Sequence, residues 1–443
     1  MLSGGTFPVL SKQKKGIYMS EKYKDTGLRP EERAKLLLEE MGLEEKMGQV
    51  NCVFPFDRVC FDYDYISEQT KYGIGEVSTL EMRRMETLEE AAAWQRKVQE
   101  IVMANSEHHI PAIFHMEGLC GAFIQDATSF PSGIGRASSF DTGLEEKIAE
   151  IVSRQEAVCG ITHVLAPVLD ISRDSRMGRQ GETYGEDPVL ASAMGTAYTR
   201  GIQKGETAGR RTESVAKHFL AFHNSEGGIH GANSMTPERT LEEIYGKPFQ
   251  AAITESNLRG IMPCYCTLNG EPVSASRTIL TKLLREEMGF DGLCVSDYGA
   301  IGNVHNCQHV GETAEEAGLL CMEAGMDVEM PNPAGYNDKL ATLFAKGEAD
   351  MALLDRAVLR VLTAKFRMGL FEHPFALQGE ELRKAFSHEK DREVSLQSAK
   401  ESMVLLKNEG VLPISRDTKK IALIGPHADC ARKFFGGYTQ MCM

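Results

Sequence analysis

The sequence predicts an α/β protein, a (β/α)8 TIM-like barrel followed by the start of a second α/β sandwich domain. Short apolar runs that end in polar or small residues are typical of parallel strands buried on both faces. Segments with helical periodicity separate these runs, and eight such units favour a closed barrel over an open sheet. The eight runs are Val50–Phe54, Gly73–Val77, Ala112–His115, Thr162–Leu169, Val215–Phe219, Gly260–Tyr265, Leu293–Asp297 and Asp327–Met330.

The helices between these runs carry their own start and stop signals. Pro30 stands in the first turn of a helix that Gly42 ends, and Gly160 follows the helix that begins at Asp141. Proline early and glycine just past the end is the usual asymmetry of helix termini. The clearest later helices are expected at Asp141–Val158, Pro237–Glu255, Arg277–Met288, Thr313–Ala324 and Met351–Met368.

The pattern divides the chain into four parts: an N-terminal extension at 1–29, the barrel at 30–370, a linker at 371–392 and the start of a sandwich domain at 393–443. In the last part a helix with Leu396, Ala399 and Met403 precedes Ile421–Pro426, which reads as a buried strand. An independent α/β domain usually needs roughly 100 residues. We therefore expect a fragment of a longer protein.

Composition narrows the class of partner. The net charge of −14 argues against nucleic acid or an anionic membrane surface and favours small neutral ligands. No run approaches the roughly 20 apolar residues of a membrane span. The eleven cysteines lack the spacing of a disulfide framework or a metal site. We expect a cytoplasmic protein without metal or cofactor, whose substrate is a small neutral molecule rather than a polyanion and which is open to forming a homo-oligomer.

Polar residues follow several of the predicted strands. They are His115, Glu117, Asp170 with Arg173, Asp174, Arg176 and Arg179, Lys217 with His218, Tyr265 and Asp297. Active sites of barrels lie at the carboxyl ends of the strands, so these side chains are expected to meet at one mouth. A concave site with a few placed polar groups suits a polar small molecule.

Each residue also has a purely structural interpretation. Asp297 and Glu117 fit helix N-caps, Lys217 fits a charge-paired strand end and His218 a satisfied core histidine. The arginines and aspartates at 173–179 fit a loop salt-bridge network, and Tyr265 and Tyr298 fit packing residues. Only convergence of several strand ends distinguishes a site from these alternatives.

Six motifs in order resemble glycoside hydrolase family 3, of the β-glucosidase and β-xylosidase type. The resemblance covers roughly residues 30 to 440 and rests on segments 43–49, 110–121, 169–179, 182–188, 217–219 and 295–300. These include Glu117-Gly118-Leu119, Lys217-His218-Phe219 and Val295-Ser296-Asp297-Tyr298-Gly299-Ala300.

The resemblance implies small-molecule glycosides or oligosaccharides as binding partners, and it implies a role for each matching residue. It implies that Asp297 is the catalytic nucleophile and that Arg179, Lys217 and His218 bind sugar hydroxyls. Glu117 stands at the position of an acidic residue that holds the outer hydroxyls. Tyr298 replaces a frequent tryptophan beside the nucleophile, and Tyr265 matches a tyrosine of the family's Ser-Tyr-Asn segment. Cys120 stands where many relatives have histidine, which implies altered substrate preference.

The second acid is harder to place. A retaining glycosidase needs a carboxylate nucleophile and a proton donor about 5–5.5 Å away. In longer family members this acid comes from the sandwich domain, and in another branch from a histidine within an Asp-Ser-His triplet. Here His230 lies near that place, but Gly228 and Ile229 replace Asp and Ser. The Ser225-Glu226-Gly227-Gly228 form resembles the sandwich-dependent branch.

Three functions remain open. The first is a retaining exo-acting β-glycosidase that removes terminal non-reducing β-D-glucosyl or xylosyl residues by double displacement through Asp297. The second is a truncated, catalytically impaired barrel that binds sugar. The third is a barrel lyase that uses Lys217 as a Schiff-base amine.

Overall fold

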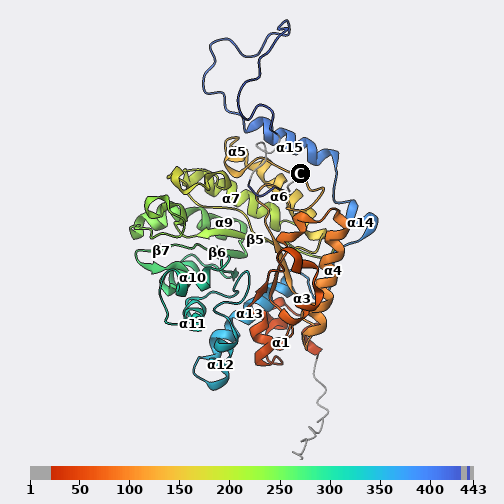
Figure 1. Ribbon diagram of the computed structural model, residues 1–443, viewed down its shortest axis with the longest axis vertical. Coiled ribbons are helices and arrows are strands. Elements are labelled where there is room, and N and C mark those ends of the chain that lie inside the picture. The colour runs from red at the N-terminus through yellow and green to blue at the C-terminus, as the bar shows by residue number, and fades with distance from the viewer. Residues whose placement is uncertain (1–20, 431–436, 440–443) are drawn as a thin grey trace, which may run out of the picture.

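The computed structural model describes residues 21–430 and 437–439. Its centre is a parallel sheet of seven strands in the order β1-β2-β3-β4-β5-β6-β9, with helices packed around it (Figure 1). These strands are β1 Cys52–Val53, β2 Glu76–Ser78, β3 Ile113–Met116, β4 His163–Val164, β5 Glu213–Phe219, β6 Gly260–Pro263 and β9 Leu293–Cys294. Seven of the eight expected runs thus contain a strand.

The eighth run, Asp327–Met330, is joined to both edges of the sheet by single bridges. Val328 pairs in parallel with Val295, just past β9, and Glu329 pairs with Asn51, just before β1. The backbone N–H of Glu329 donates to the carbonyl of Val50 over 2.9 Å. The sheet therefore returns to its first strand in the ring order that the (β/α)8 prediction requires.

Helices cover the outside of this sheet, and polar side chains begin several of them. Asp141 accepts from the N–H of Leu144 at 2.9 Å, and Asp187 accepts from the N–H of Val189 at 2.7 Å. Such caps satisfy N–H groups that a helix start leaves unpaired. The main helices are α1 Pro30–Leu38, α2 Leu43–Gln49, α3 Tyr63–Gln69, α4 Leu88–Asn105, α5 Gly133–Ala137, α6 Thr142–Val158, α7 Pro188–Gln203, α9 Lys247–Ser256, α10 Ala300–Asn306, α11 Ala314–Ala324, α12 Asp338–Lys346 and α13 Met351–Arg367.

Two expected helices are wound differently from a plain α-helix. The segment expected at 237–255 consists of the short α8 Glu238–Thr240, a π-helical turn at Leu241–Tyr245 and then α9. The segment expected at 277–288 is a π-helix at Thr278–Glu287. A short antiparallel hairpin, β7 Thr267–Leu268 with β8 Glu271–Pro272, follows β6. The helical prediction holds for both segments, but sequence periodicity does not distinguish these windings.

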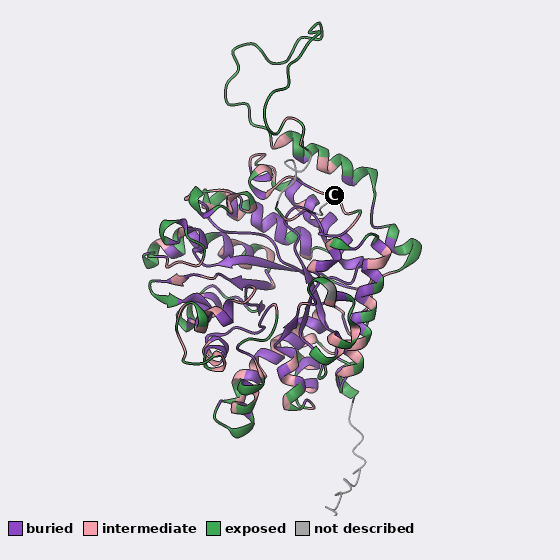
Figure 2. Cartoon of the chain, viewed as in Figure 1, coloured by how far each residue is buried: buried purple, intermediate pink, exposed green. Residues whose placement is uncertain are grey.

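The part of the chain after the barrel differs from the expectation. The expected strand at Ile421–Pro426 does not form. Ile421, Leu423 and Ile424 are 67%, 77% and 88% exposed in the loop that projects beyond α15 (Figure 2). Within the described residues no other strand pairs with this segment, and an apolar run alone does not supply backbone partners. Residues 403–430 as described therefore form no second α/β domain.

The preceding residues lie against the barrel. In the expected linker at 371–392, α14 Gly379–Arg383 buries Leu382 in the cluster that contains Trp94 of α4. The next helix, α15 Glu389–Glu401, packs on α6, where Val394 contacts the apolar cluster around Ile148. Leu396 is 55% exposed. The face of α15 that packs inward is therefore not the one that carries Leu396.

Most cysteines of the described part lie in the interior. Eight of the ten free cysteines in the described part are buried, whereas Cys307 is exposed and Cys430 intermediate. Across residues 21–430 and 437–439, no helix combines the length and the apolar character needed to cross a membrane.

The burial of Lys365 of α13 leads us to predict that the stability of the fold depends on pH. Its ammonium is fully buried and donates to Gln49 Oε1 at 2.5 Å and to the Ile74 carbonyl at 3.1 Å. Burial lowers the pKa of Lys365 from its ordinary 10.5 to about 7. Between these values the unfolded chain binds one more proton than the folded chain, so stability rises with pH by up to about 1.4 kcal/mol per pH unit.

We expect this slope to disappear in Lys365→Met. The measurement is urea unfolding of the wild type and of Lys365→Met from pH 6 to 10.5. The free energies of unfolding of the two proteins are subtracted at each pH, because the other groups titrate equally in both. Equal slopes in the two proteins above about pH 7 would contradict the burial of a titrating Lys365.

Candidate functional site

A cavity of about 160 Å³ lies at the carboxyl ends of the barrel strands. All eight candidate residues from the sequence line it: Glu117, Arg179, Lys217, His218, His230, Tyr265, Asp297 and Tyr298. They come from separate strand ends, so the convergence that distinguishes a site from structural roles is present. A larger groove of about 970 Å³ between α7 and α9 lies on the outer helices and receives none of these side chains.

Asp297 stands three residues after the end of β9 and is only 8% exposed. Its Oδ1 accepts from the Tyr265 hydroxyl at 2.6 Å and from the N–H of Tyr298 at 2.7 Å. Its buried Oδ2 accepts no hydrogen bond from any described residue. Burial raises the pKa of Asp297, and the Tyr265 hydrogen bond and the Lys217 charge oppose that rise. One oxygen is thus held and the other is left available.

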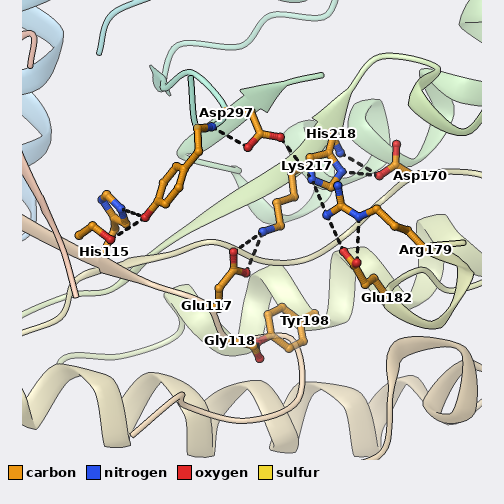
Figure 3. A network of polar contacts seen from close by, with 12 residues as sticks. His115, Glu117, Gly118, Asp170, Arg179, Glu182, Tyr198, Lys217, His218 and Asp297 are labelled. Atoms are coloured by element: carbon orange, nitrogen blue, oxygen red, sulfur yellow. Dashed lines mark hydrogen bonds and ion pairs between the residues drawn. The ribbon is translucent and has the colours of Figure 1, made fainter. Parts of the chain in front are cut away.

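Lys217, on β5, forms a buried ion pair with Glu117, which follows β3. Its Nζ lies 2.8 Å from Glu117 Oε1 and 2.7 Å from Oε2 (Figure 3). Burial raises the pKa of Glu117, and Lys217 opposes that rise. The structural interpretation of Lys217 as a charge-paired strand end is correct as far as it goes. The pair also lines the cavity and offers donors and acceptors to a ligand there.

His218, the next residue on β5, is held between a carboxyl group and an arginine. Its Nδ1 lies 2.8 Å from Asp170 Oδ2, which also accepts from the His218 N–H at 3.1 Å. Burial and the neighbouring charge of Arg179 lower the pKa of His218, so the ring is neutral. With its proton on Nδ1, its Nε2 accepts from Arg179 Nη2 at 3.3 Å. Burial raises the pKa of Asp170 to about 8.

Arg179 is fixed by a bidentate pair with Glu182. Its Nε and Nη2 donate to the two carboxylate oxygens at 2.9 and 2.8 Å, as Figure 3 shows. The other charged residues of the loop behave differently. Arg176 pairs with Asp174 at the surface, and Arg173 donates to the carbonyl of Glu186. Of the three arginines, Arg179 is the one that lines the cavity.

The two tyrosines do more than pack. Tyr265 donates to Asp297 and also reaches the carbonyl of Tyr298 at 3.0 Å. The Tyr298 hydroxyl lies 2.6 Å from Ser78 Oγ and 2.8 Å from His115 Nε2. Both tyrosines therefore donate hydrogen bonds to Asp297, Tyr265 through its hydroxyl and Tyr298 through its backbone N–H.

His230 lies at the exposed edge of the cavity. Its ring is 4.9 Å from that of Tyr265 and 5.1 Å from that of Phe222, measured between centroids. Burial and the charge of Arg179 lower its pKa. A lowered pKa leaves less of the protonated form at neutral pH, which weakens His230 as a proton donor.

Three neighbours complete the site although the sequence assigned them no role; of these, only Asp170 is among the polar residues that follow the predicted strands. Asp170 and Glu182 position His218 and Arg179; both stand inside the recognised motifs, so the motif positions are the signal that points to them. Tyr438 lines the cavity from the end of the chain, with Lys217 Nζ 5.4 Å from its ring centre and Phe123 edge-on at 6.4 Å. Nothing in its local sequence marks it.

The donor set of the cavity does not resemble a metal centre. Within the described ranges, no three His, Cys, Asp or Glu side chains are grouped so that they could hold a metal ion. The carboxylates of Glu117 and Asp297 already meet lysine, tyrosine and backbone donors.

A carboxylate with one oxygen free of hydrogen bonds to the described residues, flanked by lysine, arginine and histidine at the carboxyl face of a parallel barrel sheet, is the arrangement expected around the nucleophile of a barrel glycoside hydrolase. Residues 42–364 match the sequence model described as the glycosyl hydrolase family 3 N terminal domain, and the chain belongs to this family. The resemblance inferred from the motifs is thereby confirmed.

Known relatives support the same assignment. The chain is 33% identical over 388 residues to a beta-xylosidase of Formosa agariphila, covering 81% of this chain and 53% of the relative. It is 33% identical over 352 residues to a lysosomal beta glucosidase of Dictyostelium discoideum, covering 77% and 43%. A beta-glucosidase from Listeria innocua in complex with glucose matches with TM-score 0.81 and 29% identity, covering 93% of this chain and 56% of that one. The chain spans about half the length of these relatives.

Proposed function

We propose that this chain carries the nucleophile half of a retaining, exo-acting β-glycosidase that removes terminal non-reducing β-D-glucosyl or xylosyl residues. The observation that carries the proposal is the state of Asp297: Oδ1 accepts from two donors, while Oδ2 accepts no hydrogen bond from a described residue and has His218 Nε2 at 3.7 Å. A cavity of about 160 Å³ is smaller than the roughly 300–1,000 Å³ of drug-sized sites. It suits a single sugar ring, which supports exo action.

In the first step Oδ2 of Asp297 attacks the anomeric carbon, and the bond to the leaving oxygen breaks as that oxygen takes a proton from an acid. The resulting glycosyl ester is then cleaved by water with inversion, so the net configuration is retained. Lys217, Arg179 and His218 supply charged and neutral partners for ring hydroxyls. The raised pKa of Asp297 means that activity falls with decreasing pH earlier than it would for an ordinary aspartate.

The proton donor for the leaving group is the least supported part of the mechanism. His230 is the candidate among the described cavity-lining residues, because Glu117 is engaged by Lys217. Aryl leaving groups need little protonation, whereas the sugar leaving group of cellobiose needs it. If His230 donates the proton, His230→Asn loses cellobiose hydrolysis by about 10²-fold or more and keeps aryl glucoside hydrolysis.

A sugar-binding barrel with impaired catalysis is the second candidate. The observation that favours it is that the only carboxylates that line the cavity in the described part of the chain are Glu117 and Asp297, and the first of these is ion-paired. Failure to hydrolyse both an aryl β-glucoside and cellobiose, together with protection against unfolding by glucose, would favour this candidate.

The Schiff-base lyase is disfavoured by the pairing of Lys217. Both oxygens of Glu117 accept from its Nζ within 2.8 Å, and the ammonium form required for that pair is not a nucleophile. Borohydride treatment with a carbonyl substrate is expected to trap no adduct.

The proposed function is tested by covalent trapping. A 2-deoxy-2-fluoro-β-glucosyl or xylosyl fluoride has a good leaving group, so the first step proceeds without a strong acid and the ester accumulates. We expect mass spectrometry to find one fluoroglycosyl group on the peptide that contains residues 289–300. A fully folded protein whose peptide 289–300 stays unmodified would refute the role of Asp297.

A further inference from the structure

A chain of buried hydrogen bonds runs from the neighbouring strands β2 and β3 to the residue after the nucleophile. Ser78 of β2 and His115 of β3 are register partners, and both reach the Tyr298 hydroxyl, at 2.6 and 2.8 Å. The other ring nitrogen of His115, Nδ1, lies 2.7 Å from Glu76 Oε2. The side chains of Ser78, His115 and Glu76 are at most 1% exposed, so water does not compete for these bonds.

Glu76 fixes the orientation of the His115 ring. Burial alone would raise the pKa of Glu76, but His163 and His115 together lower it to about 2, so it is a carboxylate at neutral pH. A carboxylate only accepts hydrogen bonds, so Nδ1 of His115 carries the proton that it donates to Glu76. Nε2 is therefore directed at Tyr298 and is not free to flip away.

Tyr298 in turn controls both donors to Asp297. The N–H of Tyr298 donates to Asp297 Oδ1 at 2.7 Å. The Tyr265 hydroxyl lies 2.6 Å from the same Oδ1 and 3.0 Å from the carbonyl of Tyr298, and both oxygens accept from it. A tyrosine anchored at its hydroxyl and at both backbone groups has little freedom. Its backbone thus presents Oδ1 with a fixed pair of donors and leaves Oδ2 without one.

We propose that Glu76 and His115 are positioning residues for the nucleophile Asp297, acting through Tyr298. The expected effect on kcat rests on the proposed function, whereas the expected effect on the Asp297 carboxyl does not. The two residues hold the tyrosine ring, the ring holds the backbone at 297–298, and the backbone orients the carboxylate. Lys217, Arg179 and His218 approach Asp297 from other elements and do not take part in this series of hydrogen bonds.

The test compares His115→Leu with His108→Leu. His108 is a matched control because it is also buried and also meets a glutamate, Glu45, with Nδ1 2.6 Å from the carboxylate. It lies before β3, at the opposite end of that strand from the cavity. Each substitution therefore breaks a buried histidine–glutamate contact, but only His115 also contacts the Tyr298 hydroxyl.

The first measurement is the pKa of the Asp297 carboxyl, from carbon-13 NMR of aspartate-labelled protein assigned with Asp297→Asn. In His115→Leu we expect this pKa to rise by about 0.5 to 1, because a loosened N–H stabilises the carboxylate less. In His108→Leu it should stay unchanged. The second measurement is hydrolysis of 4-nitrophenyl β-glucoside, for which kcat falls about tenfold with KM unchanged in His115→Leu only.

The outcomes separate this inference from the proposed function. An unchanged Asp297 pKa in folded His115→Leu overturns the inference, even if kcat falls, because the residue is then structural. If the wild type neither hydrolyses nor becomes labelled, the proposed function fails and the NMR titration alone decides the inference. If His115→Leu does not fold, Tyr298→Phe, which removes the hydrogen bonds of the Tyr298 hydroxyl to His115 and Ser78, is measured in its place.

Discussion

Replacement of Asp297 by alanine is expected to lower hydrolysis of an aryl β-glucoside by about 10⁴-fold or more, in keeping with the loss of a nucleophile in other hydrolases. The reason is specific to this residue. Its Oδ2 accepts no hydrogen bond from a described residue, and Glu117, the other carboxylate that lines the cavity in the described part of the chain, is ion-paired with Lys217. Initial rates at saturating substrate measure the effect.

Two comparisons sharpen this prediction. Asp291→Asn removes an aspartate of the same stretch that pairs with Arg259 at the surface, and it should leave the rate unchanged. Added azide or formate should restore part of the activity of Asp297→Ala by entering the vacated space and attacking the anomeric carbon. A rate within tenfold of wild type in Asp297→Ala, or an equal loss in Asp291→Asn, would contradict the assignment of the nucleophile.

Replacement of Lys217 by methionine is expected to lower the free energy of unfolding by about 3 kcal/mol, because it leaves the buried carboxyl of Glu117 without its partner. Burial already raises the pKa of Glu117, and losing Lys217 raises it further. The folded variant then binds one more proton than the unfolded chain above the ordinary pKa of glutamate. The loss of stability should therefore grow as pH rises from about 5 to 8.

Urea unfolding at several pH values measures this loss. Lys204→Met is the matched control, since Lys204 meets Glu150 at 2.6 Å and Glu146 at 2.9 Å at the surface, where such pairs contribute about 0–1 kcal/mol. The double variant Glu117→Gln with Lys217→Met should recover part of the stability, because no buried charge is left. If Lys217→Met costs no more than Lys204→Met, the ion pair does not stabilise the fold.

Local patterns were sufficient for most of the barrel. Runs such as Ala112–His115, with three consecutive apolar residues before a histidine, fit a strand of a parallel sheet, and Asp141 and Gly160 mark the two ends of α6. The order of these units then predicts which strand ends lie on one face. For that reason the sequence places Asp297, Lys217, His218 and Glu117 at one mouth before any contact is known.

The part after the barrel shows where such reasoning fails. Ile421–Pro426 has the composition of a buried strand, yet it lies exposed. Burial depends on having neighbours to pair with, and periodicity within a segment carries no information about them. Likewise, Leu396 reads as part of an apolar helix face, but α15 packs on α6 through another face.

By itself, the sequence determined the β–α alternation, the family and the residue types at the mouth, because each follows from local composition and from motif order. Only the tertiary structure decided how these residues are paired. Glu117 meets Lys217 across 100 positions of chain, Asp170 meets His218 across 48, and Tyr265 meets Asp297 across 32. The ring of parallel strands brings these residues together, because it places the carboxyl ends of strands that are distant in sequence around one cavity.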